Sequence, residues 1–183
     1  LFRAGVVSFM IEQVAFLLLP LLLFRLLHRV HQRAAVAMVA LAVTAVPIAL
    51  IGVMHRLDAL WLLTDGHGLP METMTPLALL ALKSYGHAIF VASLFWGLWL
   101  LPFGYLVFTS GMLPRLAGLL LMLGGIGYLV DVFADLLLPG YADTAFSNYV
   151  HLPAALGEIG TCLWLLLMGV RAGDAQAQPR SAT

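Results

Sequence analysis

Residues 113–141 read LPRLAGLLLMLGGIGYLVDVFADLLLPGY, and this stretch decides the fold. Pro114 and Arg115 precede a run of more than twenty helix-compatible, mainly apolar residues, and Pro139 and Gly140 follow it. A helix rises about 1.5 Å per residue, so this run is long enough to cross the hydrocarbon core of a bilayer. The stretch therefore predicts a transmembrane helix.

Two groups of residues interrupt the apolar character of this helix. Gly124, Gly125 and Gly127 lack side chains, so a second helix can approach closely. Asp131 and Asp135 are one helical turn apart and share a face. A carboxyl group inside a membrane segment is costly, which makes this face a hypothesis about function.

The composition of the 183 residues extends this interpretation to the whole chain. The chain is 62% hydrophobic and only 10% charged, whereas soluble domains are about 45–50% apolar and about 25% charged. Lipid must therefore be the solvent for much of the surface. The net charge is zero and the basic residues are scattered, which argues against nucleic-acid binding. The single cysteine, Cys162, cannot form an intrachain disulfide.

The pattern of apolar runs, prolines and polar loops predicts an all-α polytopic membrane bundle with five transmembrane helices. We expect one transmembrane domain over residues 1–171, and a disordered cytoplasmic tail over residues 172–183. A polar loop with glycine and proline is expected at 64–76. The predicted spans are 2–24, 34–58, 77–107, 116–138 and 151–170.

The distribution of basic residues predicts the orientation. With five spans, the loop at 25–33, the loop at 109–115 and the tail fall on one side, and these segments carry most of the arginines. The positive-inside rule places that side in the cytoplasm. Leu1 is then outside, and because no signal peptide precedes it, we expect a further span upstream.

The depth of the acidic residues follows from their distance to the cytoplasmic arginines. Glu12 and Glu158 lie about 20 Å along their helices from Arg25 and Arg171, and Asp131 lies about 24 Å from Arg115. In a hydrocarbon layer about 30 Å thick, all three acids fall between the midplane and the outer surface.

This segregation predicts a polar cavity between the helices that opens to the outside. Its acids would hold a cation or a proton, and its lysine would balance charge or bind an anionic group. The ligand is a small molecule or ion of unknown identity, and the bilayer is the other expected partner. The candidate site residues are Glu12, Gln13, Lys83, His87, Asp131 and Glu158.

Two alternatives remain open. One is a metal-dependent hydrolase acting on lipid, with zinc held by histidines such as His87 and His151 and by an acid. No HxxxH, HExxH or CxxC pair is present, so we predict no metal site and no other cofactor, and the sequence leans away from an enzyme. The other is a structural or partner subunit whose buried charges pair only with one another and fix the helix register.

Several blocks of the sequence together resemble one known family. These blocks are LFRAGVVSFMIEQV (1–14), VPIALI (46–51), FWGLWLLPFGYLVFTSGMLPRLAGLLLMLGGIGYLVDVF (95–133), LLPGY (137–141) and LPAALGE (152–158). They are similar to the domain-of-unknown-function family 4386, whose members are mostly bacterial multipass membrane proteins. The resemblance covers nearly the whole chain.

The resemblance implies six spans in the full-length protein and a location in a bacterial cytoplasmic membrane. The matching positions are Arg3, Gln13, Asp131 and Glu158, with a looser match at residues 84–87. The chain departs from the family pattern near Phe9, where an acid is common and where Glu12 stands one turn later. The family name itself implies no function.

Overall fold

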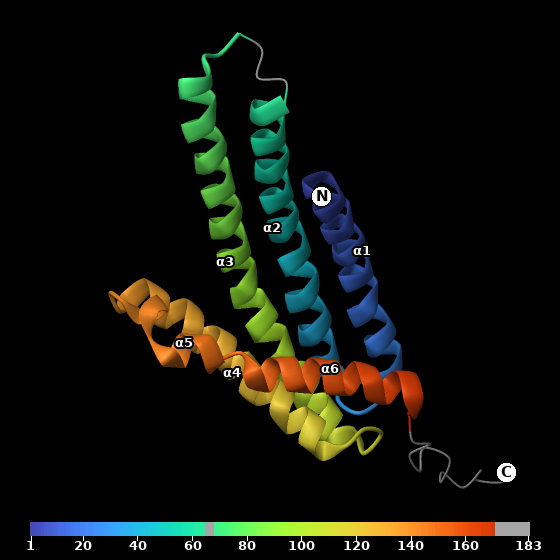
Figure 1. Ribbon diagram of the computed structural model, residues 1–183. Helices are drawn as coiled ribbons and strands as arrows, with labels where there is room; N and C mark the ends of the chain where they lie inside the picture. The colour runs from blue at the N-terminus through green and yellow to red at the C-terminus, as the bar shows by residue number, and fades with distance from the viewer. Residues whose placement is uncertain (65–67, 171–183) are drawn as a thin grey trace, which may run out of the picture.

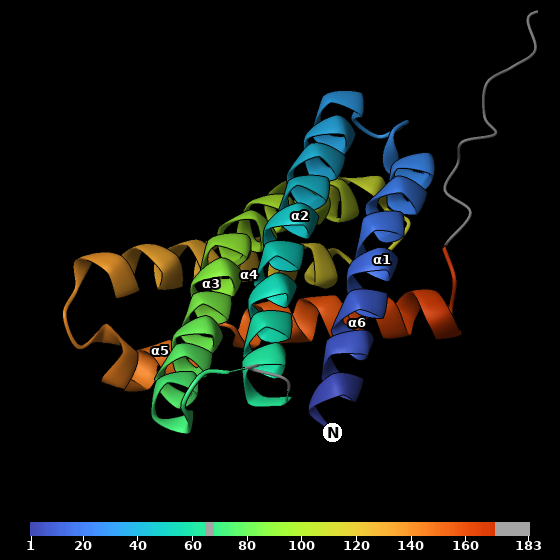
Figure 2. The same cartoon turned by 90° about the horizontal axis from the view of Figure 1, so that it is seen from above.

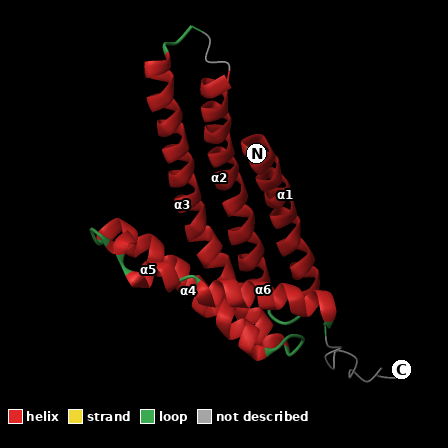
Figure 3. Ribbon diagram, viewed as in Figure 1, coloured by secondary structure: helices red, strands yellow, loops and turns green. Residues whose placement is uncertain are grey.

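The computed structural model describes residues 1–64 and 68–170, and all regular structure in these two ranges is helical. Figures 1 and 3 show long helices joined by short connections. The predicted tail at 172–183 lies outside the described residues. The elements are α1 (Phe2–Leu27), α2 (Gln32–Thr64), α3 (Met71–Ser110), α4 (Arg115–Leu137), η1 (Tyr141–Asp143), α5 (Ala145–Tyr149) and α6 (Leu152–Leu167).

Five helical segments in the described residues are long and apolar enough to cross a membrane. Four are α1, α2, α3 and α4, and the fifth runs over Ala145–Leu167 and so combines α5 with α6. This confirms the predicted all-α polytopic membrane bundle with five transmembrane helices.

The helices α2 and α3 extend further than the predicted spans 34–58 and 77–107. With 33 and 40 residues, they are about 50 and 60 Å long, well beyond a hydrocarbon core about 30 Å thick. Packing explains the extension, because Ala59 and Leu62 of α2 are buried against Ala78 of α3 in a small apolar cluster. The predicted loop at 64–76 is therefore shorter, and α3 begins directly after Pro70.

The helices form two groups that cross (Figures 1 and 2). Helices α1, α2 and α3 lie side by side, and most of their mutual packing is between α2 and α3. Helices α4 and α6 form an antiparallel pair that runs steeply across one end of this layer. Helix α4 packs against α3 and α6, so it links the two groups.

The main apolar core lies where the two groups cross. Its fully buried side chains include Leu27 of α1, Met38 of α2, Leu100 and Leu106 of α3, and Leu121 of α4. Ala154 of α6 is buried in the same core. Five helices therefore meet at this end of the molecule, whereas the opposite ends of α2 and α3 pack mainly against each other.

Glycines bring α4 close to both of its neighbours. A Cβ at Gly104 of α3 would lie 2.7 Å from the carbonyl oxygen of Gly118, and a Cβ at Gly118 would lie equally close to that of Gly104. On the other side of α4, a Cβ at Gly124 would overlap the backbone of Ala154 in α6. The expected close approach at Gly124 is thus confirmed, and α6 is the helix that approaches there.

Candidate functional site

Adjacent residues of α1 bring two polar side chains to the point where α6 crosses it. Successive residues of a helix point about 100° apart, so Glu12 and Gln13 have different surroundings. Gln13 is buried, with 1% of its surface exposed, and Glu12 is exposed. Glu158 approaches from α6 and is half-buried. The structure therefore brings together three of the six predicted site residues.

These three residues line a cavity of about 180 Å³ at the junction of four helices. Helix α3 contributes two tryptophans, and helix α4 contributes a tyrosine. The cavity thus has two carboxylates, one amide and four aromatic rings in its walls. Its lining residues are Glu12, Gln13, Phe16, Trp96, Trp99, Tyr128 and Glu158.

The ionisable groups at the ends of the acidic side chains give this cavity negative character. None of its lining residues in the described chain is a lysine, arginine or histidine. The amide oxygen of Gln13 is buried and accepts no hydrogen bond within the described residues. A buried polar group without a partner costs about 1–3 kcal/mol, so this oxygen is a place where a donor from a ligand would be stabilised.

A second, smaller cavity adjoins the first and shares Phe16, Trp99 and Glu158 with it. Its volume is about 110 Å³, and Thr161 of α6 lies in its wall. Thr161 is 2% exposed, and its hydroxyl has no hydrogen-bond partner in the part of the chain that the structure describes. The only two polar side chains that are fully buried in the described residues, Gln13 and Thr161, therefore line this pair of cavities.

Asp131 lies beside the first cavity and does not line it. Its carboxylate is 3.0 Å from Nε2 of His151, which is at the start of α6. The ring of Tyr128 packs on the His151 ring with a centroid separation of 4.5 Å. Tyr128 thus connects the cavity to the Asp131–His151 pair. Beyond the spans, burial raises the pKa of Tyr141, and the Asp131 carboxylate raises it further.

Lys83 and His87 lie elsewhere on α3. Both are exposed and neither lines the cavity formed by the other predicted residues. Nearby, the Arg56 guanidinium of α2 packs over two rings, 4.6 Å from the Tyr85 centroid and 5.5 Å from that of Phe2. The structure therefore separates the predicted basic residues from the predicted acids.

The aromatic residues of the cavity were not predicted as part of the site. Trp96 and Trp99 are one helical turn apart on α3, and Tyr128 is one turn before Asp131 on α4. This spacing is a signal, but it is equally typical of aromatic residues that pack in a core. The pairing of Asp131 with His151 joins residues 20 positions apart, and no local pattern indicates it.

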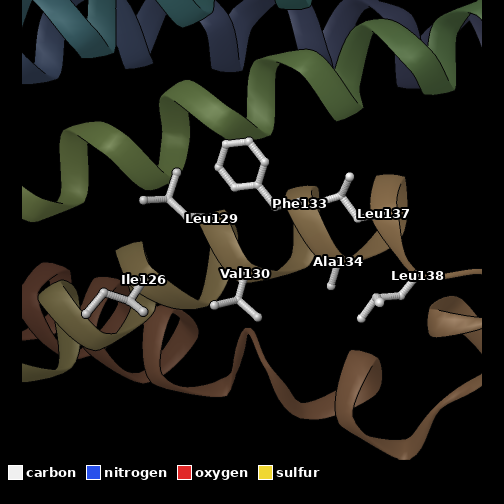
Figure 4. A pocket seen from close by; sticks show the side chains of 7 residues that line it. All are labelled: Ile126, Leu129, Val130, Phe133, Ala134, Leu137 and Leu138. Atoms are coloured by element: carbon white, nitrogen blue, oxygen red, sulfur yellow. The ribbon is translucent and has the colours of Figure 1, made fainter.

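Two other features do not form a candidate site. An open groove of about 410 Å³ lies along α4 and is lined only by apolar residues, as Figure 4 shows. Without polar groups to orient a ligand, it is suited to lipid chains. Across the described residues, no group of three histidine, cysteine, aspartate or glutamate side chains is placed to hold a metal ion.

The helical fold and the apolar length of its five long segments define the class of protein, an all-α polytopic membrane bundle. Residues 1–169 match the family described as domain of unknown function (DUF4386), and the chain belongs to this family. No curated protein and no solved structure shows significant similarity to the chain.

Proposed function

We propose that this protein binds a small cation in the cavity between α1, α3, α4 and α6. The observation that carries the proposal is a pair of carboxylates in a cavity whose wall has no basic side chain among the described residues. Glu12 and Glu158 supply negative charge, and the buried Gln13 oxygen has no hydrogen-bond partner in the described chain. A transporter or a sensor in a bacterial cytoplasmic membrane would use such a site.

The position of the site favours a ligand with positive charge. Charges interact more strongly in a low-dielectric interior than in water. Two carboxylates that approach one cavity repel each other unless a cation or a proton lies between them. A bound cation would therefore relieve this repulsion and would also supply a partner for Gln13.

The alternatives have less support from the geometry. A hydrolase that depends on a metal needs several converging ligands, and the described residues contain no such group. A purely structural role requires that the buried charges pair with one another. Asp131 has such a partner in His151, but Glu158 faces a cavity with no basic side chain in its lining.

The proposal is tested by a thermal-unfolding series on the protein in lipid nanodiscs. The series compares sodium, potassium and alkylammonium chlorides at equal ionic strength. Tetrabutylammonium, which has no N–H group and whose four butyl chains exceed a volume of about 180 Å³, serves as the reference. We expect at least one cation to raise the unfolding temperature in a saturable way, because a ligand that binds only the folded state stabilises it.

Two variants show whether that effect comes from the cavity. Glu158→Gln removes one carboxylate and should abolish the stabilisation by the cation. Glu72→Gln changes the same residue type at an exposed position near the start of α3 and should leave the stabilisation intact. If no cation stabilises the protein, or if both variants respond as the parent does, the proposal is wrong.

We also propose that the cavity opens to the outside of the cell, as the distribution of arginines predicts. A cysteine at Ser147, in α5, should react with an impermeant thiol reagent in intact cells. A cysteine at Ser110, at the end of α3, should be protected. The native Cys162 is exposed and must first be replaced by alanine. The opposite labelling pattern would reverse the orientation.

A further inference from the structure

We propose that the ligand of this cavity is a small protonated amine, such as a short alkylammonium ion. This inference rests on the proposed function and specifies the class of cation. The juxtaposition that carries it is an aromatic wall facing two carboxylates and a buried amide oxygen that lacks a donor.

The walls of the cavity are better suited to an organic cation than to an inorganic one. Inorganic cations prefer to be surrounded by oxygen ligands, whereas four of the seven lining residues here are aromatic. The faces of tryptophan, tyrosine and phenylalanine attract ammonium groups through the negative potential of the ring. An alkylammonium ion could place its charge at the carboxylates and its carbon atoms against the rings.

The rings are held in place by contacts with one another. The ring of Trp99 stacks on Phe103 with a centroid separation of 5.2 Å and an interplanar angle of 5°. Phe16 meets Trp99 edge to face, at 5.3 Å. Trp99 is 4% exposed, so this wall is preorganised and a ligand need not order it on binding.

The Gln13 oxygen distinguishes between two kinds of organic cation. It is buried and has no donor in the described chain, so a ligand with an N–H group would satisfy it. A quaternary ammonium ion has no N–H group and would leave the oxygen without a partner. We therefore infer a primary or secondary amine in its protonated form.

The size of the cavity agrees with a small amine. Its volume of about 180 Å³ equals the space of about six water molecules in the liquid. A bare metal ion would leave most of this space to be filled by water, against walls that are mainly aromatic. A short alkyl chain would fill it and displace that water.

Isothermal titration calorimetry on the protein in nanodiscs tests this inference. The probes are propylammonium, tetramethylammonium and potassium chloride. We expect propylammonium to bind most tightly. Trp96→Leu, at a half-buried wall position, should weaken propylammonium binding about tenfold and leave potassium binding unchanged. Trp61→Leu is the matched control, because Trp61 is 51% exposed and lies outside the cavity.

A second pair of variants tests the two polar contacts. Gln13→Met should remove the preference for propylammonium over tetramethylammonium, because neither ion would then have an amide acceptor. Glu12→Gln, at the exposed rim of the cavity, should weaken the binding of every cation and so tests the proposed function. If Trp96→Leu does not fold, the Gln13→Met comparison tests the amine assignment.

The outcomes separate this inference from the proposed function. If potassium binds more tightly than propylammonium, or if Trp96→Leu and Trp61→Leu bind propylammonium equally well, the amine assignment is wrong although the cavity still binds a cation. If none of the three probes binds, both proposals fail.

Discussion

Two regions of the molecule carry polar side chains on apolar helices, and the surroundings of these side chains differ between the two regions. The first is the cavity between α1, α3, α4 and α6, where Gln13 is buried without a hydrogen-bond partner in the described chain. The second is the hairpin end, which comprises residues 53–64 of α2 and 71–87 of α3. There Lys83 and His87 are exposed, and Arg56 packs on the ring of Tyr85.

The difference shows that the depth of a residue along its helix does not decide its environment. Glu12 and Lys83 both belong to spans and were both expected in one site. At the cavity, α6 crosses α1, and Gln13 is buried there. At the hairpin end, only neighbouring helices of the same layer pack together, so charged groups remain at the surface, where long side chains reach polar surroundings.

The largest expected effect compares a glycine from each region. Gly124→Leu should destabilise the protein by about 3 kcal/mol or more, because its side chain would overlap the backbone of Ala154. Gly86→Leu, at the hairpin end, should be neutral or slightly stabilising, because no atom lies within 4 Å of the place that a Cβ would occupy there. Unfolding in detergent–SDS mixtures measures both. Equal effects would mean that α4 and α6 do not pack closely.

The next effect concerns the partner of Asp131. A double-mutant cycle with Asp131→Ala and His151→Ala should give a coupling energy of about 1 kcal/mol, because their side chains lie 3.0 Å apart. A second cycle combines Asp131→Ala with Lys83→Ala. Its two changes in unfolding free energy should add, because Lys83 is exposed in the other region. Coupling of Asp131 to Lys83 would join the two regions into one site.

Gln13→Met should stabilise the ligand-free protein by about 1 kcal/mol, because it removes a buried polar group that has no partner within the described residues. Thr161→Val should act in the same direction. Thr44→Val is the matched control, since the Thr44 hydroxyl already donates to the Ala40 carbonyl oxygen at 2.8 Å, and it should bring no gain. Destabilisation by both cavity variants would indicate a structural role for these groups.

The smallest effect is expected at the hairpin end. Arg56→Gln should destabilise the protein by about 0.5–1 kcal/mol through loss of its contacts with the rings of Phe2 and Tyr85. Arg29→Gln changes an exposed arginine between α1 and α2 and should leave the unfolding free energy unchanged. Arg56→Gln could instead lower the free energy of unfolding by more than the coupling energy of Asp131 and His151. That result would contradict the expectation that polar groups at the hairpin end are held by weaker contacts.

Much of the fold was accessible from local patterns. Long apolar runs bounded by arginine, proline and glycine predicted each transmembrane helix, because a bilayer requires helices whose backbone groups bond internally. The ends of α2 and α3 were not predicted, since Ala59 and Ala78 hold the helical extensions together through a contact between the two helices. Helix length here depends on tertiary packing as well as on composition.

The candidate site was predicted only in part. Glu12, Gln13 and Glu158 share a cavity as expected from their similar depth. Asp131 lies beside it, and Lys83 and His87 lie apart. Depth follows from counting residues, but the face of each helix that meets another helix depends on how the helices cross.

The sequence by itself determined that this chain is an all-α membrane protein of five spans, and it placed acids and an amide within those spans. The reason is that apolar length and the high cost of buried charge are properties of each segment alone. Only the tertiary structure decided which polar groups meet. The glycine contacts of α4 set the crossing of α6, and that crossing brings Glu158 to Gln13 and surrounds them with aromatic rings.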